Sequence, residues 1–238
     1  GAASYGINDF LTPGTPFEGY YLKSSAGSPG SNNSSESSFG STGPIAVTGT
    51  SATWSGTNGV FNITNTYNLT TLGGQSVIAI NTSLTNISTA AITSLQFLRT
   101  LDPDPDVNAF GSYDTNNAVL SDNQACGTGT MSGQTICIYS FDAAIHRAGV
   151  SSAWTTDPAN YLAGLNDGNG DNAIGVAFDL GTIAAGQTLS VTYGYSLGAT
   201  REEAIGGGGT TVPEPASLAL LGLGLAGLGI VRRSKKTA

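Results

Sequence analysis

Val77-Ile-Ala-Ile-Asn-Thr-Ser-Leu84 has an apolar or β-branched residue at every second position from Ile78 onward, and Leu189-Ser-Val-Thr-Tyr-Gly-Tyr-Ser-Leu197 repeats this pattern. A period of two places alternate side chains on opposite faces of an extended strand. Both stretches are also rich in Val, Ile, Thr and Tyr, which are the residues enriched in strands. These two stretches therefore predict strands with one face in a core and one face in solvent.

Other segments of the chain have the same strand-like composition. Strand-like segments are separated by turns that carry Gly or Asn-Ser; they cover residues 20–22, 45–47, 60–69, 76–84, 91–101, 118–120, 135–141, 173–180 and 187–197. Two segments of about two turns each are predicted to be helical, Asp142–Ala148 and Pro158–Leu165, because Asp142 and Asp157 occupy N-cap positions. Many strands with few helices predict an all-β fold, an antiparallel β-sandwich or jelly roll with two short helices and a hydrophobic C-terminal helix.

Composition divides the chain into four parts. Residues 1–43 are rich in Gly, Ser, Pro and Asn and are predicted to be a flexible N-terminal arm. Residues 44–204 form the predicted β-sandwich domain, and 205–212 are a Gly-rich linker. Residues 213–238 form a separate tail.

The tail has three features in order. Pro213-Glu214-Pro215 comes first and residues 216–231 follow without a charge. A helix of that length spans roughly 24 Å, close to the ~30 Å hydrocarbon core once flanking basic side chains snorkel. Half of the eight basic residues of the chain close the tail: Arg232, Arg233, Lys235 and Lys236. The positive-inside rule then predicts a cytoplasmic C-terminus with the rest of the chain across the membrane; a buried core helix is the alternative.

This order of motifs, over residues 212–236, resembles the PEP-CTERM sorting signal of exported bacterial proteins. The resemblance implies that the tail holds a precursor in the inner membrane until an exosortase cuts near Pro213-Glu214-Pro215, with Arg232 and Arg233 as its basic end. It covers about a tenth of the chain. It therefore implies destination and processing, and leaves the task of the other residues open.

Charge excludes one class of partner. Residues 1–212 hold fifteen acidic side chains against four basic ones, a net charge of −11. Nucleic-acid binding needs clustered Lys and Arg to neutralise phosphates, so it is not expected. An acidic exported chain is instead compatible with cations bound outside the cell.

Cys126 and Cys137 are the only cysteines, and they flank a turn-forming stretch. An even count in an exported chain favours one disulfide. Two buried free thiols are the alternative. A zinc site is not expected with two sulfurs and a single histidine.

The densest acidic feature is Asp102-Pro-Asp-Pro-Asp106, directly after a predicted strand. Alternate prolines hold its backbone extended. Asp102, Asp104 and Asp106 repel one another unless a cation or Arg99 offsets them.

A second acidic loop runs from Asn166 to Asn172. Asp167, Asn169 and Asp171 have the 1, 3, 5 spacing of a calcium loop, but Phe178 stands where an EF-hand needs its bidentate Glu. The hypothesis is that one or both loops bind Ca²⁺ as rigidifying clamps. Solvated turns are the alternative, because Asp-Pro and Asp-Gly are ordinary turn chemistry.

Catalytic motifs are missing from the sequence. There is no Gly-x-Ser-x-Gly elbow and no phosphate loop, and His146 is the sole histidine. We therefore expect a protein that is not an enzyme.

The functional expectation is an exported cell-surface or extracellular-matrix structural protein. Self-assembly into filaments or a biofilm matrix is its boldest form, with the N-terminal arm adding a strand to a neighbouring copy. Expected partners are an exosortase, other copies of the chain or an extracellular polysaccharide. The first alternative is a carbohydrate-binding module using Trp54, Trp154 or the acidic loops, and the second is a secreted hydrolase.

Overall fold

The computed structural model describes residues 9–11, 18–32, 37–72 and 74–207. All of them belong to one compact unit that ends at Gly208. Within them, none of the helices is both long and apolar enough to cross a bilayer. The predicted membrane segment 216–231, the sorting residues Pro213, Glu214, Pro215, Arg232 and Arg233, and most of the linker lie outside the described residues.

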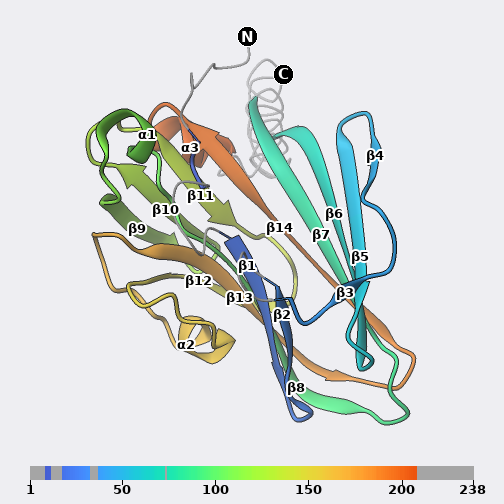
Figure 1. The fold of residues 1–238 in the computed structure, drawn as a ribbon. Helices are drawn as coiled ribbons and strands as arrows, with labels where there is room; N and C mark the ends of the chain where they lie inside the picture. The colour runs from blue at the N-terminus through green and yellow to red at the C-terminus, as the bar shows by residue number, and fades with distance from the viewer. Residues whose placement is uncertain (1–8, 12–17, 33–36, 73, 208–238) are drawn as a thin grey trace, which may run out of the picture. The chain divides into compact units, whose positions relative to one another are not determined.

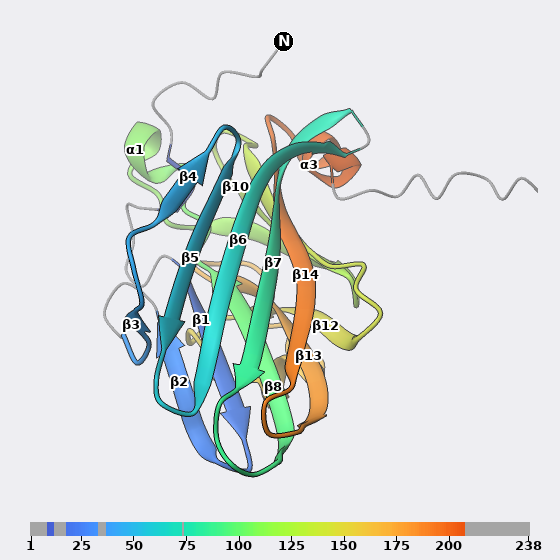
Figure 2. The same ribbon diagram turned by 90° about the vertical axis from the view of Figure 1, so that its right-hand side faces the viewer.

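Two antiparallel sheets face each other (Figures 1 and 2). The five-stranded sheet has the order β12 (Ile145–Ser151), β13 (Ala173–Ile183), β8 (Ile92–Leu101), β1 (Glu18–Ser24) and β2 (Gly27–Asn32). The nine-stranded sheet has the order β3 (Gly40–Ser41), β5 (Ser51–Thr57), β6 (Phe61–Leu72), β7 (Gln75–Asn86), β14 (Thr188–Gly198), β11 (Thr135–Tyr139), β10 (Gln124–Gly129) and β9 (Thr115–Ser121), with β4 (Ala46–Thr48) pairing with β5. The predicted antiparallel all-β fold is confirmed.

The core lies between the sheets and is built from the alternating residues. In β7, Ile80 and Leu84 are fully buried, and Val191 and Tyr193 of β14 join them. Phe97 of the opposite sheet meets the Tyr193 ring at a centroid distance of 5.9 Å. Such tilted aromatic pairs add about 0.5–1.5 kcal/mol to the burial of their area. The alternation therefore buries one face of each of these strands in the core, as the sequence predicts.

One short helix packs on the outer side of each sheet: α2 (Pro158–Leu162) on the five-stranded sheet and α3 (Arg201–Gly207) on the nine-stranded sheet. A third short helix, α1 (Val107–Phe110), follows β8. Tyr161 of α2 is fully buried against Leu98 and Ala177 on the outer side of the five-stranded sheet. Gly175 makes this possible, because a Cβ there would lie 2.8 Å from the Tyr161 ring. On the nine-stranded sheet, α3 places Ala204 against the two cysteines.

One of the two predicted helices is wrong. The segment Asp142–Ala148 contains a turn and then the start of β12, which pairs with β13. The Asp142 carboxylate is not an N-cap: it accepts hydrogen bonds from the backbone N–H of Ala144 and of Thr192. Pairing with a distant strand therefore overrides a local helix signal. The helix predicted at Pro158–Leu165 is confirmed in part as α2, and its N-cap Asp157 accepts from Ala159 N–H at 2.9 Å.

The N-terminal region also differs from the prediction of a flexible arm over residues 1–43. The strand β1 lies inside the five-stranded sheet, between β8 and β2. Tyr20, Tyr21 and Leu22 are buried there, so the sheet begins at Glu18 rather than after residue 43. An apolar triplet that pairs with β8 stabilises the strand despite its Gly- and Ser-rich neighbours.

Candidate functional site

Strand register brings the two acidic loops together. β8 ends at Leu101, which pairs with Ile174 near the start of β13. Asp102 is the next residue along one strand, and Asp171 precedes the other by two residues. Since antiparallel neighbours place the end of one strand beside the start of the other, both loops meet at one edge of the sheet.

Asp102, Asp104 and Asp171 form a cluster, which we call the aspartate cluster. Each offers a carboxylate oxygen, and these oxygens lie within 4.8 Å of one another. Asp102 is half-buried, Asp104 has 0% exposure and Asp171 is exposed. Within the described part of the chain, neither carboxylate oxygen of Asp104 has a hydrogen-bond partner. A buried carboxylate without partners is costly, so this arrangement requires an explanation.

The electrostatics of the aspartate cluster disfavour negative charge. Burial raises the pKa of Asp104 to about 7, and the nearby Asp102 and Asp171 add to the effect. Burial, with a smaller contribution from the nearby negative charge of Asp171, raises the pKa of Asp102 to about 6. The pKa of Asp171 is raised by burial and by Asp114. The three ion pairs among the described residues, Lys23–Asp157, Arg99–Glu18 and Arg147–Asp122, do not include these carboxylates.

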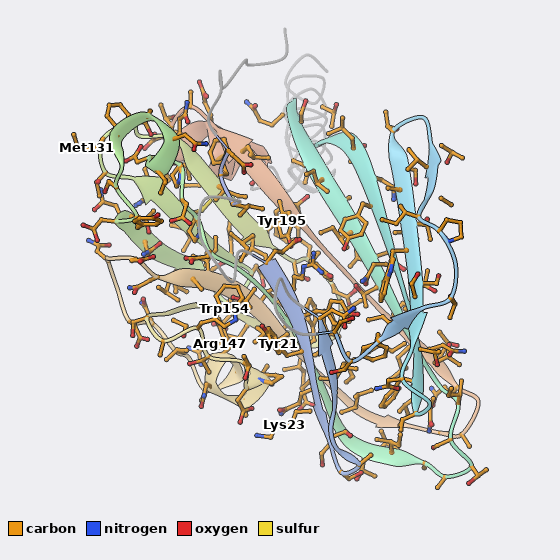
Figure 3. The ribbon with its side chains drawn as sticks, in the orientation of Figure 1. Tyr21, Lys23, Met131, Arg147, Trp154 and Tyr195 are labelled. Atoms are coloured by element: carbon orange, nitrogen blue, oxygen red, sulfur yellow. A yellow bond between two sulfur atoms is a disulfide. The ribbon has the colours of Figure 1, made fainter. Side chains whose placement is uncertain are left out.

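The other predicted loop ligands already bind protein groups. Asp106 accepts hydrogen bonds from the N–H groups of Met131 and Ser132, at 2.7 and 3.1 Å, in the turn between β10 and β11; Figure 3 shows Met131 at this end of the sheet. Asp167 accepts from Ser152 N–H and Oγ–H. Asn169 Oδ1 accepts from Asn117 N–H at 2.9 Å. The structure therefore brings together three of the six predicted residues, and it draws them from both loops.

The predicted disulfide is confirmed. Cys126 of β10 and Cys137 of β11 are bonded and directly opposite in the ladder. Both are fully buried under α3.

An ionic network in the core was not predicted. Arg99 of β8 is 3% exposed and forms an ion pair with Glu18 of β1. Its Nε donates to Tyr195 Oη at 2.7 Å, and its Nη2 donates to Tyr67 Oη at 3.3 Å. Figure 3 shows Tyr195 in the space between the two sheets. Burial lowers the pKa of Arg99, but Glu18, Tyr195, Tyr67 and Tyr193 together more than offset this and hold that pKa well above its usual value. The available signal was a lone basic residue among the Leu and Phe residues of segment 95–101.

Neither tryptophan forms an open platform. Trp54 packs on Tyr20 in the core, with ring centroids 6.3 Å apart. Trp154 Nε1 donates to Tyr21 Oη at 2.9 Å, and Figure 3 shows these two side chains near each other. Both rings contribute to packing on the five-stranded sheet.

An aromatic cleft opens elsewhere, on the outer side of the nine-stranded sheet. It has a volume of about 550 Å³, and its lining includes Tyr139, Phe141, Asp142, Thr70 and Thr192. The Tyr139 and Phe141 rings lie 5.8 Å apart at 38°, and Phe141 is 53% exposed. Because Gly194 has no side chain, the Tyr139 ring fits over β14: a Cβ at Gly194 would lie 2.6 Å from its hydroxyl oxygen.

Beside this cleft, the outer face of four neighbouring strands carries only short, uncharged polar side chains in three cross-strand rows. We call it the hydroxyl face. Its residues on β5, β6, β7 and β14, in register, are Thr57, Asn62, Thr85 and Thr188; Ser55, Thr64, Ser83 and Ser190; and Thr53, Thr66, Asn81 and Thr192. Neighbours bond to each other, as in Ser83–Ser190 at 2.8 Å and Thr85–Thr188 at 2.7 Å.

Comparisons with known proteins give one motif and one fold. Residues 211–234 match the PEP-CTERM protein-sorting motif. No curated protein matches the chain. Among solved structures, a bacterial glucoamylase complexed with acarbose is similar with a TM-score of 0.53 and 12% identity, over 80% of this chain and 28% of that chain. A putative kojibiose phosphorylase from human microbiome matches with a TM-score of 0.31 and 11% identity, over 74% of this chain and 20% of that chain. The chain thus spans less than a third of either protein, and at these identities the first shares the fold alone.

Proposed function

We propose that this chain is a structural component of the cell surface or extracellular matrix. The premise is that it is an exported protein, because its PEP-CTERM sorting motif directs processing by an exosortase. The observation that carries the proposal is the hydroxyl face. Solvated sheet faces ordinarily include charged side chains, which keep proteins apart. Here twelve uncharged side chains cover four strands in register.

The chemistry of that face favours hydrated, uncharged partners. Hydroxyl and amide groups both donate and accept hydrogen bonds, so they can pair with a neutral polysaccharide or with the same face of a second copy. Cross-strand hydrogen bonds hold these side chains in place, which lowers the entropy lost on association. An arm that donates a strand is not part of this proposal, because β1 already pairs on both sides within its own sheet.

Placing positive charge on the hydroxyl face tests the proposed structural role. We expect Thr64→Lys combined with Ser83→Lys to move the exported protein from the cell-bound or matrix fraction into the medium. Burying a lysine against an uncharged partner costs at least about 1.4 kcal/mol, which is roughly a tenfold loss of retention. Immunoblots of fractionated cultures measure this. The control, Thr182→Lys, is compared with each single variant of the pair, and it places one lysine on an exposed position of β13 in the other sheet. Retention that both variants share with the native protein would argue against a matrix role for this face.

The aromatic cleft favours a second function, saccharide binding. An exposed Phe beside Tyr139 offers faces for sugar C–H groups, while Asp142 and the threonines offer hydrogen bonds, which is the mixture of apolar and polar groups that ligand sites use. The Asp142 carboxylate is oriented by Thr192 N–H at 2.8 Å. These residues replace Trp54 and Trp154 as the candidates for a carbohydrate-binding module.

Replacing the exposed ring of this cleft tests the second function. Phe141→Ala is expected to weaken binding on a glycan array by about tenfold to a hundredfold, because burying a Phe side chain against a ligand contributes about 1.5–3 kcal/mol. Phe110→Ala is the matched control, since Phe110 is also 53% exposed but lies on α1, outside the cleft. A native protein that binds no glycan, or equal binding by both variants, would remove the cleft from consideration.

A further inference from the structure

We propose that Asp102, Asp104 and Asp171 together hold one calcium ion, which ties the end of β8 to the start of β13. This goes beyond the structural role proposed above, and it differs from calcium binding by either loop alone. Each loop supplies only part of the ligand set, and strand pairing completes it. Segments about seventy residues apart in the sequence form this single site.

Asp104 carries the argument. Its side chain has no exposed surface, and neither of its oxygens meets a donor from the described residues. Protonation alone does not resolve this, because it adds a buried hydroxyl that needs an acceptor of its own. A cation in contact with this carboxylate removes both penalties, since buried charges are ordinarily paired or bound to metals. The two neighbouring carboxylates point to a cation rather than to a neutral donor.

The other predicted ligands of the two loops already bind protein groups. Both carboxylate oxygens of Asp106, one of Asp167 and the side-chain oxygen of Asn169 accept hydrogen bonds from N–H or hydroxyl donors of the protein. These bonds instead orient the two loops: Asp106 fixes the end of one loop, and Asn169 anchors the other to β9 through Asn117. Of the six predicted loop ligands, the remaining three form the aspartate cluster.

The ligand chemistry indicates the ion. Three carboxylates and no sulfur or imidazole suit a hard cation bound through oxygen. Calcium accepts irregular sets of six to eight oxygens and tolerates flexible geometry, whereas Mg²⁺ demands a near-ideal octahedron. Asp171 is exposed, which provides an entry route and room for water ligands. Calcium sites of extracellular modules have dissociation constants of about 10⁻⁴–10⁻³ M, and an exported protein meets the ion there.

The arrangement also disfavours catalysis by these acids. A glycosidase pair must contact its substrate from both sides of the scissile bond. Asp104 has no exposed surface through which a polymer could reach it. The cluster therefore suits a buried ion better than a substrate.

Calcium titration of the full chain tests the proposal. We expect isothermal titration to give one site, and the melting temperature to rise by roughly 5–10 °C when free Ca²⁺ is about a hundred times the dissociation constant. Hydrogen exchange should slow at residues 102–106 and 166–172, where the ion holds both loops. Addition of excess EDTA should reverse both changes. None of these three measurements depends on localisation or on a matrix partner, so failure here is distinct from failure of the proposed function.

Two conservative variants identify the ligands. Asp171→Asn is the primary test, because an exposed position tolerates the change without affecting the fold; Asp104→Asn is the second, and nearly isosteric. Each is expected to weaken calcium binding at least tenfold and to abolish most of the thermal shift. Asp114→Asn removes the same charge from a nearby acid outside the aspartate cluster and should retain most of the response. A native protein without binding heat or thermal shift, an Asp171→Asn variant that responds like the native protein, or tighter binding of Mg²⁺ would each overturn the proposal.

Discussion

Replacing Glu18 by alanine is expected to lower the free energy of unfolding by about 3–5 kcal/mol, because it leaves the buried Arg99 guanidinium without its counter-charge. The cost arises from the burial of Arg99 rather than from the partly exposed Glu18. Tyr67 and Tyr195 still accept hydrogen bonds from the guanidinium, but a hydrogen bond to a hydroxyl group does not replace the lost counter-charge. In urea denaturation monitored by circular dichroism, the midpoint should fall while the slope stays the same.

A double-mutant cycle separates this effect from a loss of packing. Arg99→Met keeps much of the volume of the side chain and removes its charge. The variant carrying both Glu18→Ala and Arg99→Met should be clearly more stable than the sum of the two single effects predicts, by about 1–3 kcal/mol. Additive effects would show that the two side chains contribute independently and that the buried pair has no special role.

Removing the disulfide is expected to produce the second large effect. Cys126 and Cys137 are 11 residues apart, and in the chain-entropy model a crosslink of that span contributes about 3 kcal/mol. Replacing both by alanine should lower the stability by about that amount, because the unfolded chain gains freedom that the bond had removed. The Ala204 contact preserves the packing of α3 over the site, so a folded protein is still expected.

Reduction supplies the control for this prediction. The native protein, unfolded and refolded in dithiothreitol, should match the double-alanine variant in its denaturation midpoint, and the variant itself should not respond to the reductant. If the reduced native protein kept its full stability, the crosslink would not be a source of stability in this fold.

Local pattern predicted most of the architecture. Alternation in Val77–Leu84 and Leu189–Leu197 identified strands whose core faces are buried as expected. The two cysteines and the C-terminal motif were also recognisable, because each depends on residue type and order along the chain. Where local signals were weak or misleading, the prediction was wrong. Asp142 resembled an N-cap, and the Gly- and Ser-rich composition placed the start of the β domain at residue 44, although the strand predicted at residues 20–22 is confirmed as part of β1.

The sequence by itself determined the strand class, the disulfide candidates, the two acidic loops and the sorting tail, since all of these are encoded over short stretches. Only the tertiary structure decided which acids meet. The register of β8 and β13 joins Asp102 and Asp104 to Asp171 while Asp106 turns to the backbone of the β10–β11 turn. The tertiary structure also pairs Arg99 with Glu18, 81 residues away, and brings Thr70 and Thr192 to the Tyr139–Phe141 pair, which makes the cleft. Strand periodicity is a local property, whereas side-chain encounters depend on how distant strands are ordered and aligned.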